Sequence, residues 1–312
     1  MKNFPKIALG AWAWGTGNVG GNQIFGHNLE KNDLQPIFDV AMKANLNLWD
    51  TATVYGMGAS EEILGSFVKN VEREKIFIST KFTPQIAGIY ENSVEKMLDA
   101  SLQRLNTNFI DIYWIHNPMD VEKWTPMLPP LIKSGKIKKI GVSNHNLQEL
   151  KRADEILKNF GCRVDAVQNH FSLLNRSSEK ILDYCKENDI KFFAYMVLEQ
   201  GALSGKYDTK NPFPEGSARA QIYNPILPQL EELIGEMKKI GEKNNLSVAQ
   251  VGTVWAISKG TLPIVGVTKI HHVTDLEKIL DVKLSDDEIK ILENFADKAN
   301  VSTIREWEKK ME

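Results

Sequence analysis

A repeated alternation of short apolar runs with longer amphipathic stretches constrains this chain more than any other feature. The apolar runs have the length of strands, and between them apolar residues recur at the spacing of a helix face. Alternating strands and helices form a parallel sheet, and eight repeats favour a closed (β/α)8 TIM barrel over an open doubly wound sheet. The predicted strands cover residues 7–12, 46–52, 76–81, 110–115, 137–142, 165–168, 191–195 and 262–267.

The predicted helices lie between and after these strands, and three of them have capping signals. Ser60 is expected to cap the helix that follows it, and Asn92 with Glu95 and Ser285 with Glu288 have the spacing of a capping box. A segment rich in Gly, Pro and Asn, residues 205–225, follows the seventh strand and is predicted to be a long functional loop. Other helices are expected at residues 33–44, 123–134, 147–160, 178–188, 226–245, 247–259 and 273–280, with an extra helix at 285–296.

Length and charge favour a single soluble domain. A barrel of this kind accommodates 312 residues without a division, so one domain is expected over residues 1–312. The net charge is −2 with both signs interspersed, which gives no footprint for nucleic acid or an anionic membrane. No secretory signal or long apolar run is present, and the two cysteines share no motif spacing. We therefore expect a cytoplasmic protein with a small-molecule partner; its oligomeric state stays open.

Ionisable side chains stand at the ends of three consecutive predicted strands. The second strand leads to Asp50, with Tyr55 in the loop after it, the third ends in Lys81, and the fourth leads to His116. The carboxyl ends of barrel strands meet at one face, so these four side chains are expected to converge. Burying Lys81 without a partner would be costly, so an ion pair with Asp50 is the expected solution.

This combination suits acid–base chemistry on a carbonyl group. A phenol has a pKa of about 10, which is high for proton donation near neutrality, and an adjacent Lys81 ammonium is expected to lower the pKa of Tyr55. Asp50 would keep Lys81 charged and oriented. A neutral His116 can donate a hydrogen bond to the substrate oxygen and offset its developing charge.

At these residues the sequence resembles the aldo-keto reductase superfamily. The similarity runs from about residue 6 to residue 296, nearly the whole chain. The run LWDTATVYG at residues 48–56, followed by SEEILG at 60–65, is similar to the family's first signature. Further matching motifs follow in order: STK at 79–81, WIH at 114–116, GVSN at 141–144, VQN at 167–169 and LEQGALSGKY at 198–207.

The resemblance implies an enzyme that reduces aldehydes or ketones to alcohols by hydride transfer from NADPH. It implies Asp50, Tyr55, Lys81 and His116 as the catalytic tetrad, with Tyr55 as the general acid. It also implies a set of cofactor-binding residues with distinct roles. Ser143, Asn144 and Gln168 would bind the nicotinamide carboxamide, Tyr195 would stack on its ring, and the phosphates and adenosine would contact Leu198, Gly201, Leu203, Lys206, Val267, Thr268, Lys269, His272 and Asp275.

The chain departs from the family pattern at two places. Met196 and Val197 stand where family members often have Ser-Pro after the tyrosine of strand seven, so the side-chain hydrogen bond to the pyrophosphate is not expected there. His272 and Leu276 stand where many members have an Arg or Gln and, four residues on, an Asn, whereas Asp275 keeps the acidic neighbour. Adenine recognition is therefore expected to differ.

The loop after the eighth strand predicts a preference for NADPH over NADH. Gly266 lets the chain turn closely over the cofactor, and the Thr268 hydroxyl and Lys269 ammonium that follow can bind a 2′-phosphate. His272 is expected to strengthen the preference once it is protonated, below about pH 6.5.

The substrate pocket is expected to be aromatic. Trp12 and Trp14 end the first strand and Trp114 lies two residues before His116, so all three are predicted to line the pocket, although one of the first two fits the core equally well. The segment 300–312 is short and charged and is expected to leave the pocket open.

Two other functions are compatible with a barrel. Potassium-channel β-subunits keep the barrel and the cofactor but serve as redox-sensing partners; nothing in this chain looks like an added interaction arm, which favours an enzyme. A metal-dependent hydrolase needs clustered histidines and carboxylates at strand ends. Of the six histidines only His116 ends a strand, and no H-x-H pair occurs, so no metal site is expected.

Overall fold

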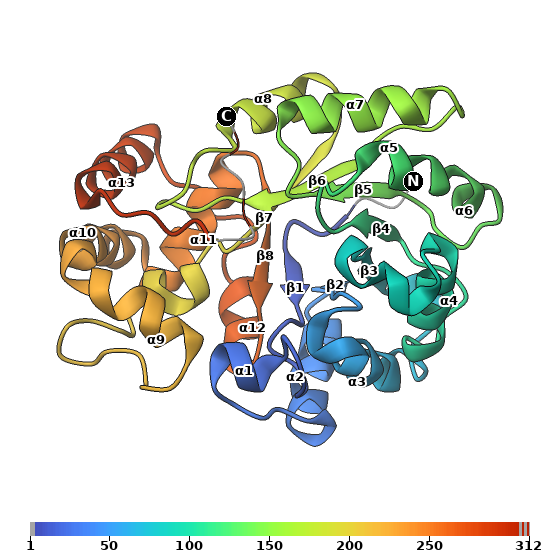
Figure 1. The fold of residues 1–312 in the computed structure, drawn as a ribbon. Coiled ribbons are helices and arrows are strands. Elements are labelled where there is room, and N and C mark those ends of the chain that lie inside the picture. Colours follow the sequence, from blue (N-terminus) through green and yellow to red (C-terminus); the bar gives the residue numbers. More distant parts are fainter. Residues whose placement is uncertain (1–3, 306–307, 309–310, 312) are drawn as a thin grey trace.

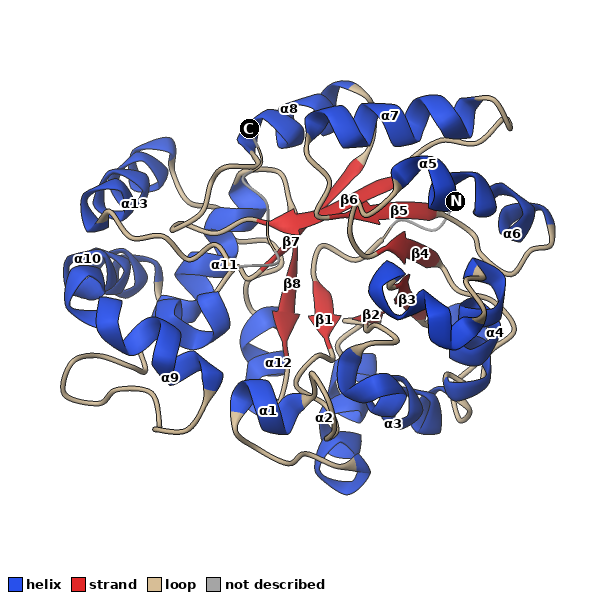
Figure 2. Cartoon of the chain, in the orientation of Figure 1, coloured by secondary structure: helices blue, strands red, loops and turns tan. Residues whose placement is uncertain are grey.

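The fold is a closed barrel of eight parallel strands, as predicted. The structure, a computed structural model, describes residues 4–305, 308 and 311. Each strand pairs with the next in chain order, and β1 closes the barrel against β8, with Leu9 opposite Val265. Helices surround the strands (Figures 1 and 2). The strands are β1 (Ala8–Gly10), β2 (Leu48–Asp50), β3 (Phe77–Phe82), β4 (Ile112–Ile115), β5 (Ile140–Ser143), β6 (Ala166–His170), β7 (Lys191–Tyr195) and β8 (Leu262–Gly266).

The helices cover the outside of the barrel with their apolar faces. In the helix of residues Lys31–Lys43, for example, Leu34, Ile37, Phe38 and Ala41 recur at helical spacing and are buried. The α-helices are α1 (Gly21–Phe25), α2 (Lys31–Lys43), α3 (Ala59–Val68), α4 (Val94–Arg104), α5 (Val121–Trp124), α6 (Pro129–Lys133), α7 (Leu147–Lys158), α8 (Glu179–Glu187), α9 (Ala218–Tyr223), α10 (Leu227–Asn244), α11 (Val248–Ser258), α12 (Ile270–Glu277) and α13 (Asp286–Ala299). Short 3-10 helices include η1 (Tyr55–Gly58), η3 (Pro84–Tyr90) and η5 (Glu199–Ser204).

Residue alternation along the strands decides which side chains face the interior of the barrel. Every second residue of a strand faces the same side, so Trp49 belongs to the core under the helices whereas Leu48 faces inward. The same alternation places Asp50 on the inward side, two residues after Leu48, and His116 two residues after Trp114. The interior cluster consists of Ala8, Leu48, Ile112, Trp114, Ala166, Phe193 and Leu262.

Two of the three predicted helix caps are wrong. α3 begins after Gly58, and the predicted cap Ser60 lies inside the helix, where its buried hydroxyl donates to the carbonyl oxygen of Ala11 at 2.7 Å. α4 is capped by Ser93 and not by Asn92; the Ser93 hydroxyl oxygen accepts a hydrogen bond from a backbone N–H of the first turn. Both local sequences offer alternative cap positions within three residues, and the tertiary contacts select among them.

The long loop predicted after β7 lies beside the loop after β1. η5 follows β7 directly, and α9 forms within residues 205–225 and contacts α1. On the same side of the molecule α10 packs against both α11 and α13, which thickens the outer layer there (Figure 1). Within the described part of the chain, no helix has the length and apolar character needed to cross a lipid bilayer.

Candidate active site

Four polar side chains converge at the carboxyl ends of β2, β3 and β4. Asp50 ends β2, Lys81 lies in β3, His116 follows β4, and Tyr55 begins η1 after β2. Lys81 Nζ donates to Asp50 Oδ2 at 2.6 Å and to the carbonyl oxygen of Thr51 at 2.7 Å. Its third contact is the hydroxyl oxygen of Tyr55, at 3.5 Å. The structure thus brings together the four residues that the sequence singled out.

Lys81 and Asp50 form the buried ion pair that was predicted. The side chain of Lys81 has no exposed surface, and that of Asp50 is 4% exposed. Asp50 Oδ1 also accepts from the Ser79 hydroxyl at 2.5 Å and from the Gln168 amide at 3.0 Å. A buried pair is tolerated when its remaining polar atoms have partners, as these have. Burial lowers the pKa of Lys81, while the Asp50 carboxylate opposes the loss of its proton.

The Lys81 contact determines where the Tyr55 proton can point. An ammonium group has only donors, so the Tyr55 oxygen accepts, and its own hydrogen remains available for another group. The ring stacks on Trp12 at 5.6 Å between centroids and meets His116 edge-on at 6.0 Å. The turn after Tyr55 requires glycine, because Gly56 has φ 60° and a Cβ there would lie 2.7 Å from a backbone carbonyl oxygen.

The pKa of Tyr55 differs from the prediction. Burial of the phenol raises the pKa of Tyr55 well above its usual value, and the Asp50 charge adds to this effect. The expected lowering by Lys81 is wrong, because the Lys81 charge is already offset by Asp50, which lies closer to it than Tyr55 does. Tyr55 is therefore protonated at neutral pH, as a general acid must be.

His116 is held as a neutral imidazole. Burial, followed by the Lys81 charge, lowers the pKa of His116 well below its usual value. Its Nδ1 lies 3.0 Å from the Thr83 hydroxyl, and its backbone N–H donates to the carbonyl oxygen of Phe82 at 2.8 Å. With Nδ1 engaged by Thr83, Nε2 is the ring nitrogen left to face a substrate.

The groups predicted to bind a nicotinamide carboxamide adjoin this cluster. Ser143 donates to the carbonyl oxygen of Gln168 at 2.8 Å, and the Asn144 amide donates to the carbonyl oxygen of His116 at 2.9 Å. The Asn144 side-chain oxygen accepts from the Tyr195 hydroxyl at 2.6 Å. Asn144 has φ 60°, a conformation that asparagine tolerates better than most residues. These contacts link the predicted cofactor residues to the backbone of His116.

The loop after β7 places its predicted cofactor residues in different environments. Gly201 has φ 110°, which favours glycine. Leu198 is half-buried and Lys206 is exposed, so both side chains can reach a ligand. Leu203 is fully buried, which leaves only its backbone for such a contact.

Arg219, which the sequence analysis did not single out, ties two loops together. Its guanidinium donates to the carbonyl oxygen of Phe25 at 2.8 Å and to that of Gln200 at 3.2 Å. Phe25 ends α1 after β1, and Gln200 lies in η5 after β7, so one side chain bridges the two segments. No local motif marks Arg219, because its partner on α1 lies 194 residues away in sequence.

The loop after β8 combines positive charge with a helix start that has no side-chain cap. Lys269 is exposed, and α12 begins directly after it without a side-chain acceptor for its first-turn N–H groups. The Thr268 N–H donates to His272 Nδ1 at 3.2 Å. Burial, then the charges of His271 and Lys269, lowers the pKa of His272 to about 4. The expectation that protonated His272 strengthens the preference for NADPH below about pH 6.5 is therefore wrong. Asp275 forms an ion pair at 3.1 Å with the lysine three residues on.

The tryptophans predicted to line the pocket separate into one candidate and two core residues. Trp12 is half-buried and stacks on Tyr55. Trp14 has no exposed surface, and its indole N–H donates to the carbonyl oxygen of Val267 at 2.8 Å, so it belongs to the core. Trp114 is also fully buried, inside the barrel, because its position in β4 points inward below His116.

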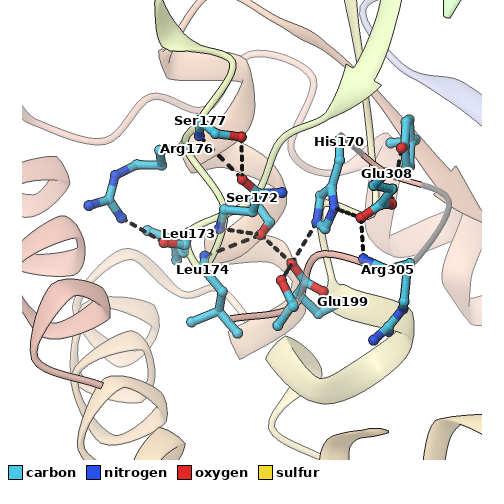
Figure 3. Close-up of polar contacts among 12 residues, drawn as sticks. His170, Ser172, Leu173, Leu174, Arg176, Ser177, Glu199, Arg305 and Glu308 are labelled. Atoms are coloured by element: carbon cyan, nitrogen blue, oxygen red, sulfur yellow. Dashed lines mark hydrogen bonds and ion pairs between the residues drawn. The ribbon is translucent and has the colours of Figure 1, made fainter. Parts of the chain in front are cut away.

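A buried ionic cluster beside the ends of β6 and β7 was not predicted. His170 Nε2 lies 2.8 Å from Glu199 Oε1, and His170 Nδ1 lies 2.9 Å from Glu308 Oε2 (Figure 3). Thr303, Arg305 and Glu308 are each at most 8% exposed, so these residues of the segment 300–312 pack into the molecule beside this cluster. The members of the cluster lie 29 and 138 residues from His170, too far for any local motif.

The central cluster can deliver a proton to an oxygen atom. It offers a protonated phenol, a neutral imidazole and a buried ammonium around one point, which suits a group that gains negative charge as it reacts. Among residues 4–305, 308 and 311, no group of three or more His, Cys, Asp or Glu side chains is placed to hold a metal ion.

Comparisons with known proteins identify the family of this chain. The sequence profile of the Aldo/keto reductase family matches residues 6–297. The chain belongs to the aldo-keto reductase family. The chloroplastic pyridoxal reductase of Arabidopsis thaliana is 31% identical to this aldo-keto reductase over 324 residues, covering 97% of this chain and 86% of the relative. The NADP(+) aldo-keto reductase yakc of Schizosaccharomyces pombe is 30% identical over 315 residues, covering 93% and 89%.

Solved structures share the fold of this aldo-keto reductase. A glycerol dehydrogenase from Gluconobacter oxydans superposes with a TM-score of 0.79 and 24% identity, covering 96% of this chain and 94% of that one. An aldo-keto reductase from Klebsiella pneumoniae, crystallised with NADPH, gives a TM-score of 0.72 and 22% identity, covering 99% and 94%.

Proposed function

We propose that this aldo-keto reductase uses NADP(H) to reduce aldehydes or ketones to alcohols, with Tyr55 as the general acid. The observation that carries the proposal is the contact of the buried Lys81 ammonium with the oxygen of a protonated Tyr55, beside a neutral His116. Family membership supports the reaction type, and the NADPH complex of the Klebsiella pneumoniae relative supports the cofactor.

The residues at the ends of β5, β6 and β7 suit a nicotinamide. Ser143, Asn144 and Gln168 offer both donors and acceptors, which a carboxamide group requires. Tyr195 is half-buried, so part of its ring is open to stack on a second ring. A bound nicotinamide would supply the hydride during reduction.

The residues around α12 suit the 2′-phosphate of NADP(H). Lys206 and Lys269 both lie near enough to His272 to lower its pKa, so two ammonium groups gather beside the uncapped start of the helix. Gly266 is exposed, and a Cβ built there would meet no atom within 4 Å, which leaves room next to the loop. Opposite charge and free N–H groups are the features that bind phosphate.

The proton in this scheme comes from the chain itself. Tyr55 donates its hydrogen to the carbonyl oxygen, because Lys81 occupies the other side of the phenol oxygen. Lys81 then stabilises the phenolate that remains, and Asp50 keeps Lys81 charged and oriented. His116 Nε2 orients the same oxygen through a hydrogen bond. The stacked rings of Trp12 and Tyr55 give the pocket an aromatic wall, which suits aromatic aldehydes.

The proposal predicts that the purified protein oxidises NADPH in the presence of small aromatic aldehydes, without added metal. The measurement is the loss of NADPH absorbance across a panel of aldehydes, ketones and sugars, with a chelator present and with NADH in parallel. Tight NADPH binding without turnover on any carbonyl would instead indicate a cofactor-binding regulatory protein.

A further inference from the structure

The cluster of His170, Glu199 and Glu308 takes no part in the mechanism above, yet it is almost fully buried. Both ring nitrogens of His170 face carboxylate oxygens, at 2.8 Å from Glu199 and 2.9 Å from Glu308. A carboxylate only accepts hydrogen bonds, so both nitrogens must carry hydrogens and the ring is an imidazolium. The cluster therefore holds a cation between two anions that come from distant parts of the chain (Figure 3).

The second oxygen of Glu308 connects this cluster to the predicted cofactor site. Glu308 Oε1 accepts from the Tyr195 hydroxyl at 3.0 Å, while the same hydroxyl lies 2.6 Å from Asn144 Oδ1. The Tyr195 and His170 rings lie 5.5 Å apart between centroids, tilted by 31°. The single hydroxyl hydrogen of Tyr195 is therefore shared between two acceptors, Asn144 and Glu308, and the Tyr195 ring lies beside the imidazolium.

The C-terminal segment is fastened so that Glu308 stays in place. Glu308 Oε2 accepts from the backbone N–H of Arg305 at 2.9 Å, and the Arg305 guanidinium donates to the Tyr223 hydroxyl at 2.6 Å. The Thr303 hydroxyl donates to Glu199, at the opposite nitrogen of the His170 ring from Glu308, at 2.9 Å, so this bond does not hold Glu308 itself. Glu308 thus reaches Tyr195 across 113 residues of sequence from a segment anchored at several points.

We infer that Glu308, held by His170, is a positioning residue for Tyr195, so that the C-terminal segment forms part of the site for the nicotinamide half of the cofactor. The inference rests on the proposed function, in which Tyr195 stacks on the nicotinamide ring. A stacking side chain that is already fixed loses less rotational freedom on binding, which strengthens affinity. The effect is confined to the nicotinamide half, because α12 and Lys269 lie at the other end of the predicted site.

The test compares two ligands by isothermal titration calorimetry. NADP+ has both halves of the cofactor, whereas adenosine 2′,5′-bisphosphate lacks the nicotinamide. Glu308→Ala is expected to weaken NADP+ binding roughly tenfold, the effect of about one charged hydrogen bond, and to leave the affinity for adenosine 2′,5′-bisphosphate unchanged. Glu308→Gln should weaken NADP+ binding less than Glu308→Ala, because its oxygen can accept from Tyr195 and its amide can donate to a neutral His170, although the Arg305 N–H loses its acceptor.

Thr303→Val is the matched control, since it removes a hydrogen bond from the same cluster without touching Tyr195. It should leave both affinities unchanged. If Glu308→Ala weakens both ligands equally, or if neither Glu308 variant changes NADP+ binding, Glu308 has only a structural role or none, and the inference is overturned. If the wild-type protein binds neither ligand, the proposed cofactor is wrong and the inference is overturned with it. If Glu308→Ala does not fold, Glu308→Gln alone provides the test. Equal weakening of NADP+ and adenosine 2′,5′-bisphosphate binding by Glu308→Gln would then contradict the positioning role of Glu308.

Discussion

The chemistry of the site depends on three protonation states, those of Tyr55, His116 and Lys81. Burial raises the pKa of Tyr55 and lowers those of His116 and Lys81, so each group is pushed toward its neutral form. Only Lys81 has a counter-charge in direct contact, at 2.6 Å from Asp50. The result is one proton to donate, one neutral hydrogen-bond donor and one fixed positive charge.

These protonation states predict a broad pH plateau for carbonyl reduction. The active form has Tyr55 protonated and His116 neutral. Because the pKa of Tyr55 is raised, its proton is retained above its usual range, and because the pKa of His116 is lowered, it stays neutral below about pH 6.5. The value of kcat/KM for a non-ionising aldehyde should therefore be constant between about pH 6 and pH 9. A fall centred near pH 7 would show that one of the two states is assigned incorrectly.

Sequence alone could predict some of these residues and not others. The Asp50–Lys81 pair follows from the cost of burying a lysine at a strand end, and that cost holds for any barrel with this order of strands. The direction of the Tyr55 pKa shift could not be predicted, because it depends on how much water the surrounding loops remove. Glu308 and Arg219 could not be found either, since the contacts that connect them to the site, with Tyr195 and Phe25, span more than a hundred residues of sequence.

Among the single elements, helix α12 begins earlier than its sequence predicts. The sequence predicts this helix from residue 273, but it begins at Ile270, three residues earlier. Its N-cap is Lys269, whose side chain cannot accept the first-turn N–H groups, so the usual capping signal is missing. At residue 285, where a serine and a glutamate form a true capping box, the predicted start of α13 is confirmed. The first turn of α12 therefore has no side-chain cap, in contrast to α13.

The uncapped helix end predicts a contribution of Lys269 to NADPH affinity. Lys269→Ala removes an exposed ammonium beside the first turn of α12 and should weaken NADPH binding about ten- to a hundredfold, the range for a charged hydrogen bond, with NADH unaffected. Dissociation constants can be measured by quenching of tryptophan fluorescence. Lys278→Ala, at the other end of the same helix, is the control and should change neither affinity. Equal affinities of the wild-type protein for NADPH and NADH would contradict this assignment.

At the scale of the whole molecule, the barrel could be predicted because its repeating unit is local. The periodicity of apolar residues predicts each strand and its helix, and eight such repeats favour a closed barrel. The C-terminal residues have no such period, so their return to the barrel mouth depends on contacts that only the folded chain creates. α1 is likewise too short for a periodic signal.

The buried cluster predicts a pH-dependent contribution to stability. Burial alone would lower the pKa of His170, but Glu199 and Glu308 outweigh it and raise the pKa to about 9. Because the pKa of His170 is higher in the folded protein, protonation of His170 stabilises the folded state by about 3 kcal/mol below about pH 6.5. This stabilisation is lost as the pH rises through about 9. The difference between wild type and His170→Asn in the urea concentration at the unfolding midpoint should therefore become smaller from pH 6 to pH 10. A gap independent of pH would mean that His170 is neutral in the folded protein.

The most direct test of the central claim, that Tyr55 is the proton donor of an NADP(H)-dependent reductase, is the steady-state reduction of an aromatic aldehyde by wild type and Tyr55→Phe. The phenol acts in the transition state, so kcat should fall by about 10²–10⁴-fold, the usual contribution of general acid catalysis. The dissociation constant for NADPH, measured on the same preparations, should not change. A Tyr55→Phe variant with nearly wild-type kcat would contradict the account and point to another donor, such as His116.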